Sequence, residues 1–216
     1  MATPSTQRIA LASYPRSGNT WVRFLLEAAT GERCGSLYRD RIMRRDTHGL
    51  VIKTHQLDSA RYWRAIHLVR DPFDAIESHF HWQRDIAGRQ RTRWDQHVEK
   101  GVEAWKRHTE HWLEAACAPY RLRYEDLHAA PQTALLDLLR WLERPVSEAA
   151  VSAAVAAGSL ANMRSLHEML GSRFFRRGEV GASYQAFTDR QLRAAVDRLA
   201  PLLHRLGYDE VVVRFR

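Results

Sequence analysis

One stretch near the start of the chain, residues 9–26, constrains the fold more than any other. Residues 9–12 form a short apolar run, which is typical of a strand buried on both faces. Pro15 then ends the strand, because proline has no N–H to donate to a sheet, and Ser17 or Asn19 is the expected cap of a following helix. The predicted helix face consists of Trp21, Phe24, Leu25 and Ala28. The pattern predicts a strand, a tight loop and a helix.

A loop of this kind is an anion site, because it directs several backbone N–H groups and the positive end of the helix dipole at one point. The side chains of Arg16, Ser17, Asn19 and Thr20 add donors around it. It is not a Walker A loop, since Gly18 is its one glycine and Asn19 stands where the lysine would be. The loop predicts a phosphate site without implying ATP. An ordinary strand-to-helix turn is the alternative.

Length and charge limit the class of protein. A chain of 216 residues with 45% apolar residues predicts one compact domain over 1–216, with loose ends at 1–7 and 209–216. The formal net charge is +8, from 33 Lys and Arg against 25 Asp and Glu, and most of the basic residues are arginine. This charge favours an anionic partner: nucleic acid, a membrane surface or a phosphorylated small molecule.

The spacing of the cysteines and the length of the apolar runs indicate the cellular compartment. Cys34 and Cys117 have neither metal-binding nor disulfide spacing, which predicts reduced thiols in a cytoplasmic protein. No apolar run resembles a signal peptide or approaches the length of a membrane span. The abundant arginine and alanine would suit a bacterium of high genomic GC.

Further short β-type runs alternate with helical patterns, which predicts an α/β fold with a central parallel sheet and helices on both faces. The later strands are expected at residues 49–54, 64–70 and 120–124. Helices are expected from residue 72, where Asp71 would be the cap, and then at 95–117, 132–143, 147–157, 159–168 and 188–205. Residues 31–48 read as a basic loop or short helix, and 88–94 and 170–187 as loops. Residues 211–213 are either an edge strand or a loose tail.

Polar side chains stand where the predicted strands end. Arg16 follows the first strand, Lys53 and His55 end the second, Arg70 ends the third and Tyr124 ends the fourth. Ligands of such sheets bind beyond the carboxyl ends of the strands. These five side chains are therefore expected to converge on one site.

Lys53 and His55 are two residues apart, so in an extended chain they share a face. A histidine with a pKa near about 6.5 can accept a proton from a hydroxyl at neutral pH. A neighbouring lysine can neutralise a phosphate or a developing oxyanion. Two solvated polar residues at a strand end are the alternative.

Arg70 leaves the third strand, and Ser78 lies two turns into the helix that follows. A guanidinium and a hydroxyl so placed can hold a phosphate between them. A surface arginine and a solvent-facing serine are the alternative.

Taken in order, these segments resemble the PAPS-dependent sulfotransferases, whose donor is 3′-phosphoadenosine 5′-phosphosulfate (PAPS). Residues 13–21 resemble the family's 5′-phosphosulfate loop, with Arg16 where lysine is usual, and residues 53–55 resemble its catalytic Lys-Thr-His. Arg70 and Ser78 have the spacing of its 3′-phosphate motif. Residues 176–181 resemble its late Arg-Lys-Gly-x-x-Gly element. Residues 124–127, and Ser159 and Leu160 with Met163, resemble stretches on its adenine side.

The resemblance implies a role for each segment. Arg16, Thr20 and the N–H groups of the loop, which includes Ser17, Gly18 and Asn19, would hold the 5′-phosphosulfate. Lys53 would stabilise the bridging oxygen, and His55 would deprotonate the acceptor hydroxyl. The 3′-phosphate would be bound by Arg70, Ser78, Arg176, Arg177 and Gly178. Trp21, Tyr124, Ser159 and Leu160 would lie on the adenine side. The product would be PAP (3′-phosphoadenosine 5′-phosphate), and no metal is implied.

The chain departs from the family pattern in three ways. Ala182, Ser183 and Tyr184 stand where Asp-Trp-Lys is usual, although Phe187 and Thr188 fit again. Arg16 keeps the charge of lysine but changes its reach. The chain is also short, which implies missing acceptor-side loops and an open acceptor site.

The acceptor, a small molecule or a group on a glycan or peptide, stays unidentified. Its expected contacts come from residues 34–47 and 80–95, and the aromatic residues there are Tyr38, Phe80, Trp82 and Trp94. The arginines of these segments suggest an acidic acceptor, with solvated charge as the alternative.

Other histidines predict no metal site. His79 and His81 are two apart on a helix and would point apart, and His108 and His111 are expected to be solvated. Two other functions compete with sulfuryl transfer. A nucleotide phosphotransferase would need Mg²⁺ and lacks its Gly-Lys-Ser/Thr here. An RNA- or polyanion-binding module would use the arginines alone, but no nucleic-acid partner is expected.

Overall fold

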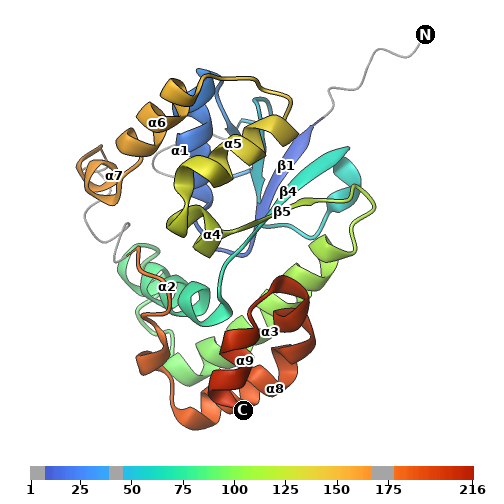
Figure 1. The fold of residues 1–216 in the computed structure, drawn as a ribbon. Coiled ribbons are helices and arrows are strands. Elements are labelled where there is room, and N and C mark those ends of the chain that lie inside the picture. The colour runs from blue at the N-terminus through green and yellow to red at the C-terminus, as the bar shows by residue number, and fades with distance from the viewer. Residues whose placement is uncertain (1–7, 39–45, 167–177) are drawn as a thin grey trace.

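A computed structural model describes residues 8–38, 46–166 and 178–216 (Figure 1). Its five strands form one parallel sheet in the order β2-β3-β1-β4-β5. The strands are β1 (Ile9–Ser13), β2 (Gly35–Ser36), β3 (Ile52–Thr54), β4 (Arg64–Val69) and β5 (Tyr120–Arg123). The predicted α/β fold with a central parallel sheet is therefore confirmed.

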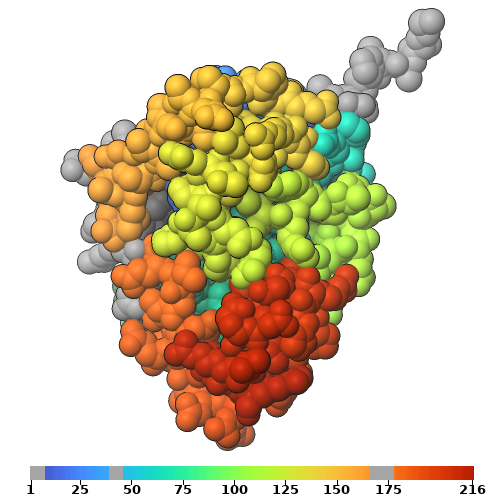
Figure 2. All heavy atoms as spheres, viewed as in Figure 1, coloured from blue at the N-terminus to red at the C-terminus, as the bar shows by residue number. Residues whose placement is uncertain are grey.

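The described helices pack in two groups. The first consists of α1 (Asn19–Thr30), α4 (Tyr124–Ala129), α5 (Pro131–Trp141), α6 (Glu148–Ala157) and α7 (Leu160–Leu166). The second consists of α2 (Pro72–Asp85), α3 (Trp94–Leu113), α8 (Asp189–Leu206) and α9 (Asp209–Phe215). Short 3-10 turns are η1 (Ser59–Arg61) and η3 (Tyr184–Ala186). In the space-filling view the yellow α5 and α6 cover the upper part of one face, and the red α8 and α9 cover the lower part (Figure 2).

Alternation along β1 assigns its two faces to different cores. Leu11 packs with residues of α1, α5 and α6. Ala10 and Ala12 point the other way, where Trp112 of α3 and Tyr62 pack against them. Small residues on this face leave room for the fully buried indole of Trp112. Trp105 and Trp112 of α3 therefore belong to the core.

Helix α1 presents a different face to the core from the predicted one. Its buried apolar residues are Val22, Leu25, Leu26 and Ala29, whereas Ala28 is exposed. Its N-cap is Gly18 without any side-chain cap, so the predicted Ser17 or Asn19 cap is wrong. The Asn19 side chain instead turns inward and donates to the carbonyl of Leu11 at 3.0 Å. The loop is held by bonds to β1, and this sets the rotation of the helix.

Three further expectations need correction. Residues 209–215 form helix α9, neither an edge strand nor a loose tail, because Val211 and Val212 are buried against the core while Val213, the third valine of the run, faces solvent. His108 is buried, not solvated. Residues 31–48 contribute the short strand β2 as well as a loop. The expectations for residues 1–7, for the arginines of 39–45 and for Arg176 and Arg177 lie outside the described residues.

Candidate active site

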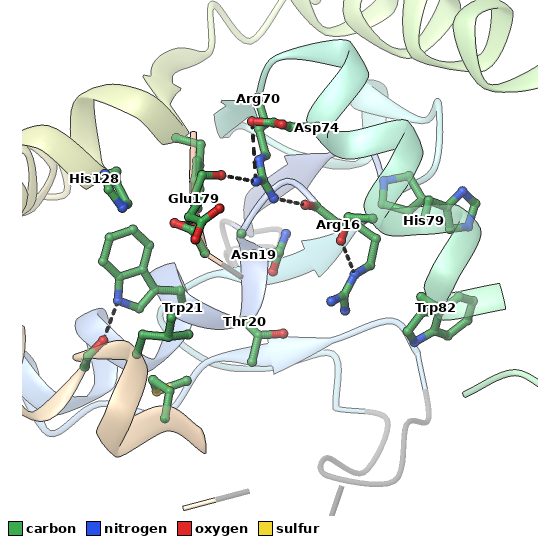
Figure 3. Close-up of a pocket in the computed structure, with 18 of the residues that line it drawn as sticks. Arg16, Asn19, Thr20, Trp21, Arg70, Asp74, His79, Trp82, His128 and Glu179 are labelled. Carbon is green, nitrogen blue, oxygen red and sulfur yellow. Dashed lines mark hydrogen bonds and ion pairs between the residues drawn. The ribbon is translucent and has the colours of Figure 1, made fainter. Parts of the chain in front are cut away.

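A cavity of about 780 Å³ lies beyond the carboxyl ends of the strands, where the sequence predicts a site. Segments far apart in the sequence line it, and Figure 3 shows how their side chains converge. The predicted site residues among its lining are Arg16, Gly18, Asn19, Thr20, Trp21, Lys53, His55, Arg70, Ser78, Tyr124, Ser159, Leu160 and Gly178. The structure therefore brings these residues together.

Two groups of predicted residues differ from the rest. The side chain of Ser17 is fully buried and does not line the cavity. Arg176 and Arg177 fall among the residues that the structure leaves undescribed. For Ser17 only the backbone remains as a candidate ligand.

The loop between β1 and α1 packs closely against the ring of Tyr124. Gly18 has a φ of 99°, and a Cβ added there would lie 2.6 Å from Cδ2 of the Tyr124 ring. Arg16 also has a positive φ, 68°, which is uncommon for a residue with a side chain. Asn19 anchors the loop to β1, because its side-chain Nδ2 donates to the carbonyl of Leu11 and to Ser13 Oγ. Strained backbone that its neighbours hold in place is a feature of ligand sites.

Two aromatic rings form one side of the cavity. The rings of Trp21 and Tyr124 are 5.7 Å apart and nearly edge to face. Each is fixed by a hydrogen bond across the chain: Trp21 Nε1 donates to the carbonyl of Gly158 at 2.9 Å, and Tyr124 Oη donates to that of Gly178 at 3.3 Å. Fixed aromatic faces of this kind can bind a planar ring.

Arg70 connects the loop to the opposite wall. Its guanidinium donates to the carbonyls of Arg16 at 3.2 Å and of Glu179 at 3.0 Å. It also pairs with Asp74 at 3.6 Å and lies 4.3 Å over the Tyr124 ring (Figure 3). Its Nε is buried and has no hydrogen-bond partner within the described residues. Arg70 also lines the cavity, where a guanidinium is suited to bind an oxyanion.

The two predicted anion sites meet at Arg16. Its Nε donates to Ser78 Oγ at 3.3 Å, so the loop after β1 and helix α2 are in direct contact (Figure 3). The cavity therefore holds two arginines, from different strand ends, on one continuous surface.

His55 is a neutral imidazole with a defined tautomer. Its Nδ1 lies 2.6 Å from the carbonyl oxygen of Ser13, which can only accept, so Nδ1 carries the hydrogen and Nε2 the lone pair. Burial, followed by the positive charge of Lys53, lowers its pKa to about 3. Tyr38 fixes the residue from the other side, because its ring stacks on the imidazole at 5.1 Å and its hydroxyl accepts the His55 backbone N–H.

Several lining residues were not predicted as site residues. Asp74, Glu77, His79, His128 and Glu179 all line the cavity. His79 contacts Tyr14 Oη and the Gln83 side chain, and burial lowers its pKa to about 4. Asp74, Glu77 and His79 could have been noticed in the sequence only because they flank Ser78 on α2.

Of the four aromatic residues expected at the acceptor, Tyr38 and Trp82 line the cavity. Phe80 and Trp94 do not. Their rings pack together at 4.9 Å between α2 and α3, because Phe80 lies on the buried side of its helix.

No group of three or more His, Cys, Asp or Glu side chains suited to a metal occurs within residues 8–38, 46–166 and 178–216. Over the same ranges, no helix is both long and apolar enough to span a bilayer.

Known proteins resemble this chain in sequence. The family described as "Sulfotransferase domain" matches residues 41–207. A WSCD family member of Aedes aegypti, AAEL009094, is 32% identical over 169 residues, which are 68% of this chain and 53% of that protein. The chain thus spans about half the length of the curated relatives it matches.

Solved structures resemble it in fold. Mouse sulfotransferase SULT7A1 complexed with PAP superposes with a TM-score of 0.75 at 20% identity, over 97% of this chain and 88% of that one. Retinol dehydratase in complex with androsterone and inactive cofactor PAP gives a TM-score of 0.63 at 15% identity, over 91% and 80% of the two chains. These superpositions show that the chain shares the fold of those proteins, a parallel sheet with a loop between β1 and α1 at its carboxyl edge. The chain belongs to the sulfotransferase domain family.

Proposed function

We propose that this chain transfers a sulfuryl group from PAPS to a hydroxyl or amine of an acceptor. One observation carries the proposal: a single cavity gathers Arg16, Lys53, His55 and Arg70 from three separate strand ends. Two arginines suit the two anionic ends of the donor, and the Lys-His pair suits proton and charge transfer between donor and acceptor.

The residues present fit the nucleotide. The guanidinium of Arg70, the hydroxyl of Ser78 and Gly178, which all line the cavity, would bind the 3′-phosphate. The family resemblance adds Arg176 and Arg177, which lie outside the described residues, as further proposed ligands. Arg16, Thr20 and the loop N–H groups would bind the 5′ end. The adenine side would consist of Trp21, Tyr124, Ser159 and Leu160. PAPS, when bound, supplies the activated sulfuryl group, and no metal is needed for its transfer.

His55 is the proposed general base. Its Nε2 carries a lone pair at neutral pH because Nδ1–H is committed to Ser13, so Nε2 would accept the acceptor's proton. Lys53, which lines the same cavity, would neutralise charge on the leaving oxygen. The reaction then depends on positioning and charge, as phosphoryl transfer does.

The acceptor would enter past Tyr38 and Trp82. Retinol dehydratase was crystallised with androsterone, and for this chain we likewise propose a small molecule or an exposed group of a glycan or peptide, not a nucleic acid. Cys34 and Cys117 are free thiols, which fits the cytoplasmic location that we propose.

Calorimetric titration tests the donor. We expect the protein to bind PAP tightly, 5′-AMP much more weakly, and ATP with Mg²⁺ no better than 5′-AMP. Equal affinity for PAP and 5′-AMP would overturn the sulfotransferase assignment. A preference for ATP with Mg²⁺ would favour a phosphotransferase.

His55→Ala tests the base. Transfer of ³⁵S from labelled PAPS to a panel of phenols, amines and sugars should fall to background, while PAP affinity stays within about twofold, because His55 is not expected to hold the nucleotide. Retained transfer would remove His55 as the base.

A further inference from the structure

Residues 178–184 form one wall of the cavity, here called the late wall. Gly178, Glu179, Ala182 and Ser183 line the cavity, and the wall has no helix or strand until η3 begins at Tyr184. An irregular segment has no ladder to hold it, so its position depends on bonds to other elements.

Those bonds come from helix α2. Asp74 Oδ2 accepts the backbone N–H of Gly181 at 2.8 Å, and Asp74 Oδ1 accepts that of Ser183 at 3.2 Å. Asp71 Oδ2 accepts the Tyr184 hydroxyl at 2.6 Å. Glu77 Oε2 accepts the Ser183 hydroxyl at 3.4 Å. The late wall therefore donates four hydrogen bonds to three carboxylates.

The carboxylates form a row. Asp71, Asp74 and Glu77 are spaced by three residues at the start of α2, so they lie on one side of it. All three are at least 95% buried. A buried carboxylate is costly unless its oxygens are hydrogen-bonded, and here the late wall supplies donors to each one. The row and the late wall are complementary in hydrogen bonding, since one supplies the acceptors and the other the donors.

The chain departs from its family in the late wall. Where Asp-Trp-Lys is usual, Ser183 and Tyr184 supply the two hydroxyl donors of the row. The Tyr184 ring is anchored separately, since it packs 5.5 Å from Phe73 and 4.9 Å from Phe215. The acceptors of these two hydroxyl groups are the carboxylates of Glu77 and Asp71, on α2.

Arg70 links the row to the nucleotide site. It pairs with Asp74 at 3.6 Å and donates to the carbonyl of Glu179 in the late wall. Tyr124 binds the Gly178 carbonyl in the same wall. Any shift of the late wall would therefore move the partners of the proposed 3′-phosphate ligands.

We propose that Asp71, Asp74 and Glu77 are positioning residues, an acidic latch that holds the late wall where it completes the 3′-phosphate site. The inference rests on the proposed function for the nature of the ligand, but the latch itself does not. Asp74 and Glu77 line the cavity, but each of the three carboxylates accepts a hydrogen bond from the late wall, and that support is the role we propose for them. Their effect should be larger on the 3′-phosphate, through Arg70 and Gly178, than on the rest of the donor.

Amide hydrogen exchange without nucleotide tests the latch directly. The double variant Ser183→Ala/Tyr184→Phe removes two hydroxyls and keeps both backbone amides and the aromatic ring. We expect the N–H groups of Gly181 and Ser183 to exchange about tenfold faster or more in this variant, since their segment opens more readily. Tyr208→Phe is the matched control, because it loses a hydroxyl bond to the carboxylate of Glu125 outside the late wall. Unchanged protection in the double variant would overturn the latch.

Calorimetry with PAP and 5′-AMP tests the consequence. The double variant should bind PAP about tenfold more weakly, while 5′-AMP affinity changes less than about twofold. Equal weakening of both would overturn the link to the 3′-phosphate. If the double variant folds poorly, Ser183→Ala alone should also lower the ratio of PAP affinity to 5′-AMP affinity, by a smaller factor. An unchanged affinity ratio in this single variant would likewise overturn the link to the 3′-phosphate. A wild-type protein that does not prefer PAP would refute the proposed function, while the exchange result would still decide the latch.

Discussion

Two walls of the same cavity are built in opposite ways. In the early wall, residues 15–21, the backbone is anchored to the adjoining strand: Asn19 bonds to β1 only a few residues before it, and contacts with distant residues, such as Gly18 against Tyr124, add to that anchor. The late wall is held by side chains of α2, with Gly181 bonding to Asp74 across 107 residues of sequence. The early wall thus has an anchor only a few residues away in the sequence, whereas the anchors of the late wall lie on α2.

The largest expected effect is at the early wall. Gly18→Ala would place a Cβ 2.6 Å from the Tyr124 ring at a φ of 99°, so the loop and the ring cannot both stay. We expect PAP and 5′-AMP to lose affinity alike, by about 100-fold, because both share the 5′ end. Gly88→Ala is the control, with a similar φ of 71° and nothing within 4 Å of its new Cβ. A selective loss of PAP alone would contradict the distinction between the walls.

Arg70→Ala removes the residue that joins the two walls. Its loss should weaken the affinity for PAP by about 10- to 100-fold, which is the contribution expected from one or two charged hydrogen bonds. The affinity for 5′-AMP should change by less than about threefold. Isothermal titration of both nucleotides measures the ratio. Arg190→Ala, an exposed arginine on α8, serves as the control. A ratio that does not change would place the 3′-phosphate elsewhere.

Acid should act on the supports of the two walls with opposite sign. His67 of β4 pairs with Ala12 of β1, and burial lowers its pKa from 6.5 to about 3 in the folded protein. Its contribution to stability is fully present above pH 6.5 and is lost as the pH falls toward 3. Burial raises the pKa of Asp71, under the late wall, from 3.8 to about 7, so its contribution is present below pH 3.8 and lost as the pH rises through 7.

His67→Gln tests the acid side. In urea titrations between pH 6.5 and 4, the free energy of unfolding of the variant should fall less steeply than that of the wild type. The difference in slope should approach one proton, about 1.4 kcal/mol per pH unit. Parallel curves would show that His67 does not titrate on unfolding.

The smallest expected effect concerns His55. The charge of Lys53 helps to lower the pKa of this imidazole, so Lys53→Met should raise that pKa toward its ordinary value. NMR titration of the imidazole Cε1 proton measures the shift, and Lys100→Met, an exposed lysine of α3, is the control. An unmoved titration would mean that burial alone sets the pKa.

Local features of the sequence predict the order of strand, loop and helix in the early wall and the positions of the strand ends, but not the cap or the buried face of α1. The strand, loop and helix of residues 9–30 and the Asp71 cap, whose oxygen accepts from Phe73 and Asp74, depend on neighbours a few residues apart. The convergence of Lys53, His55 and Arg70 follows from the rule for parallel sheets, which needs no knowledge of packing.

Features with distant partners could not be predicted. The acidic latch pairs α2 with residues a hundred positions later, and the spacing of Asp71, Asp74 and Glu77 alone looks like a solvated helix face. His108 seemed solvated because its burial depends on how α3 lies against β4, where it meets His67 at 5.8 Å between rings. The run at 211–213 reads as a strand until α8 is in place beside it.

The central position of β1 has a consequence for how the chain is made. Ala10 pairs with Ile52 on one edge and with Ala65 on the other, so both partners of this apolar strand are synthesised long after it. Until they arrive, each edge of β1 presents unpaired N–H and C=O groups to other nascent chains. Parallel pairing across long loops is also slow. Newly made protein should therefore aggregate through residues 9–13, and slower synthesis at low temperature or a chaperone that covers this strand should raise the yield of folded protein.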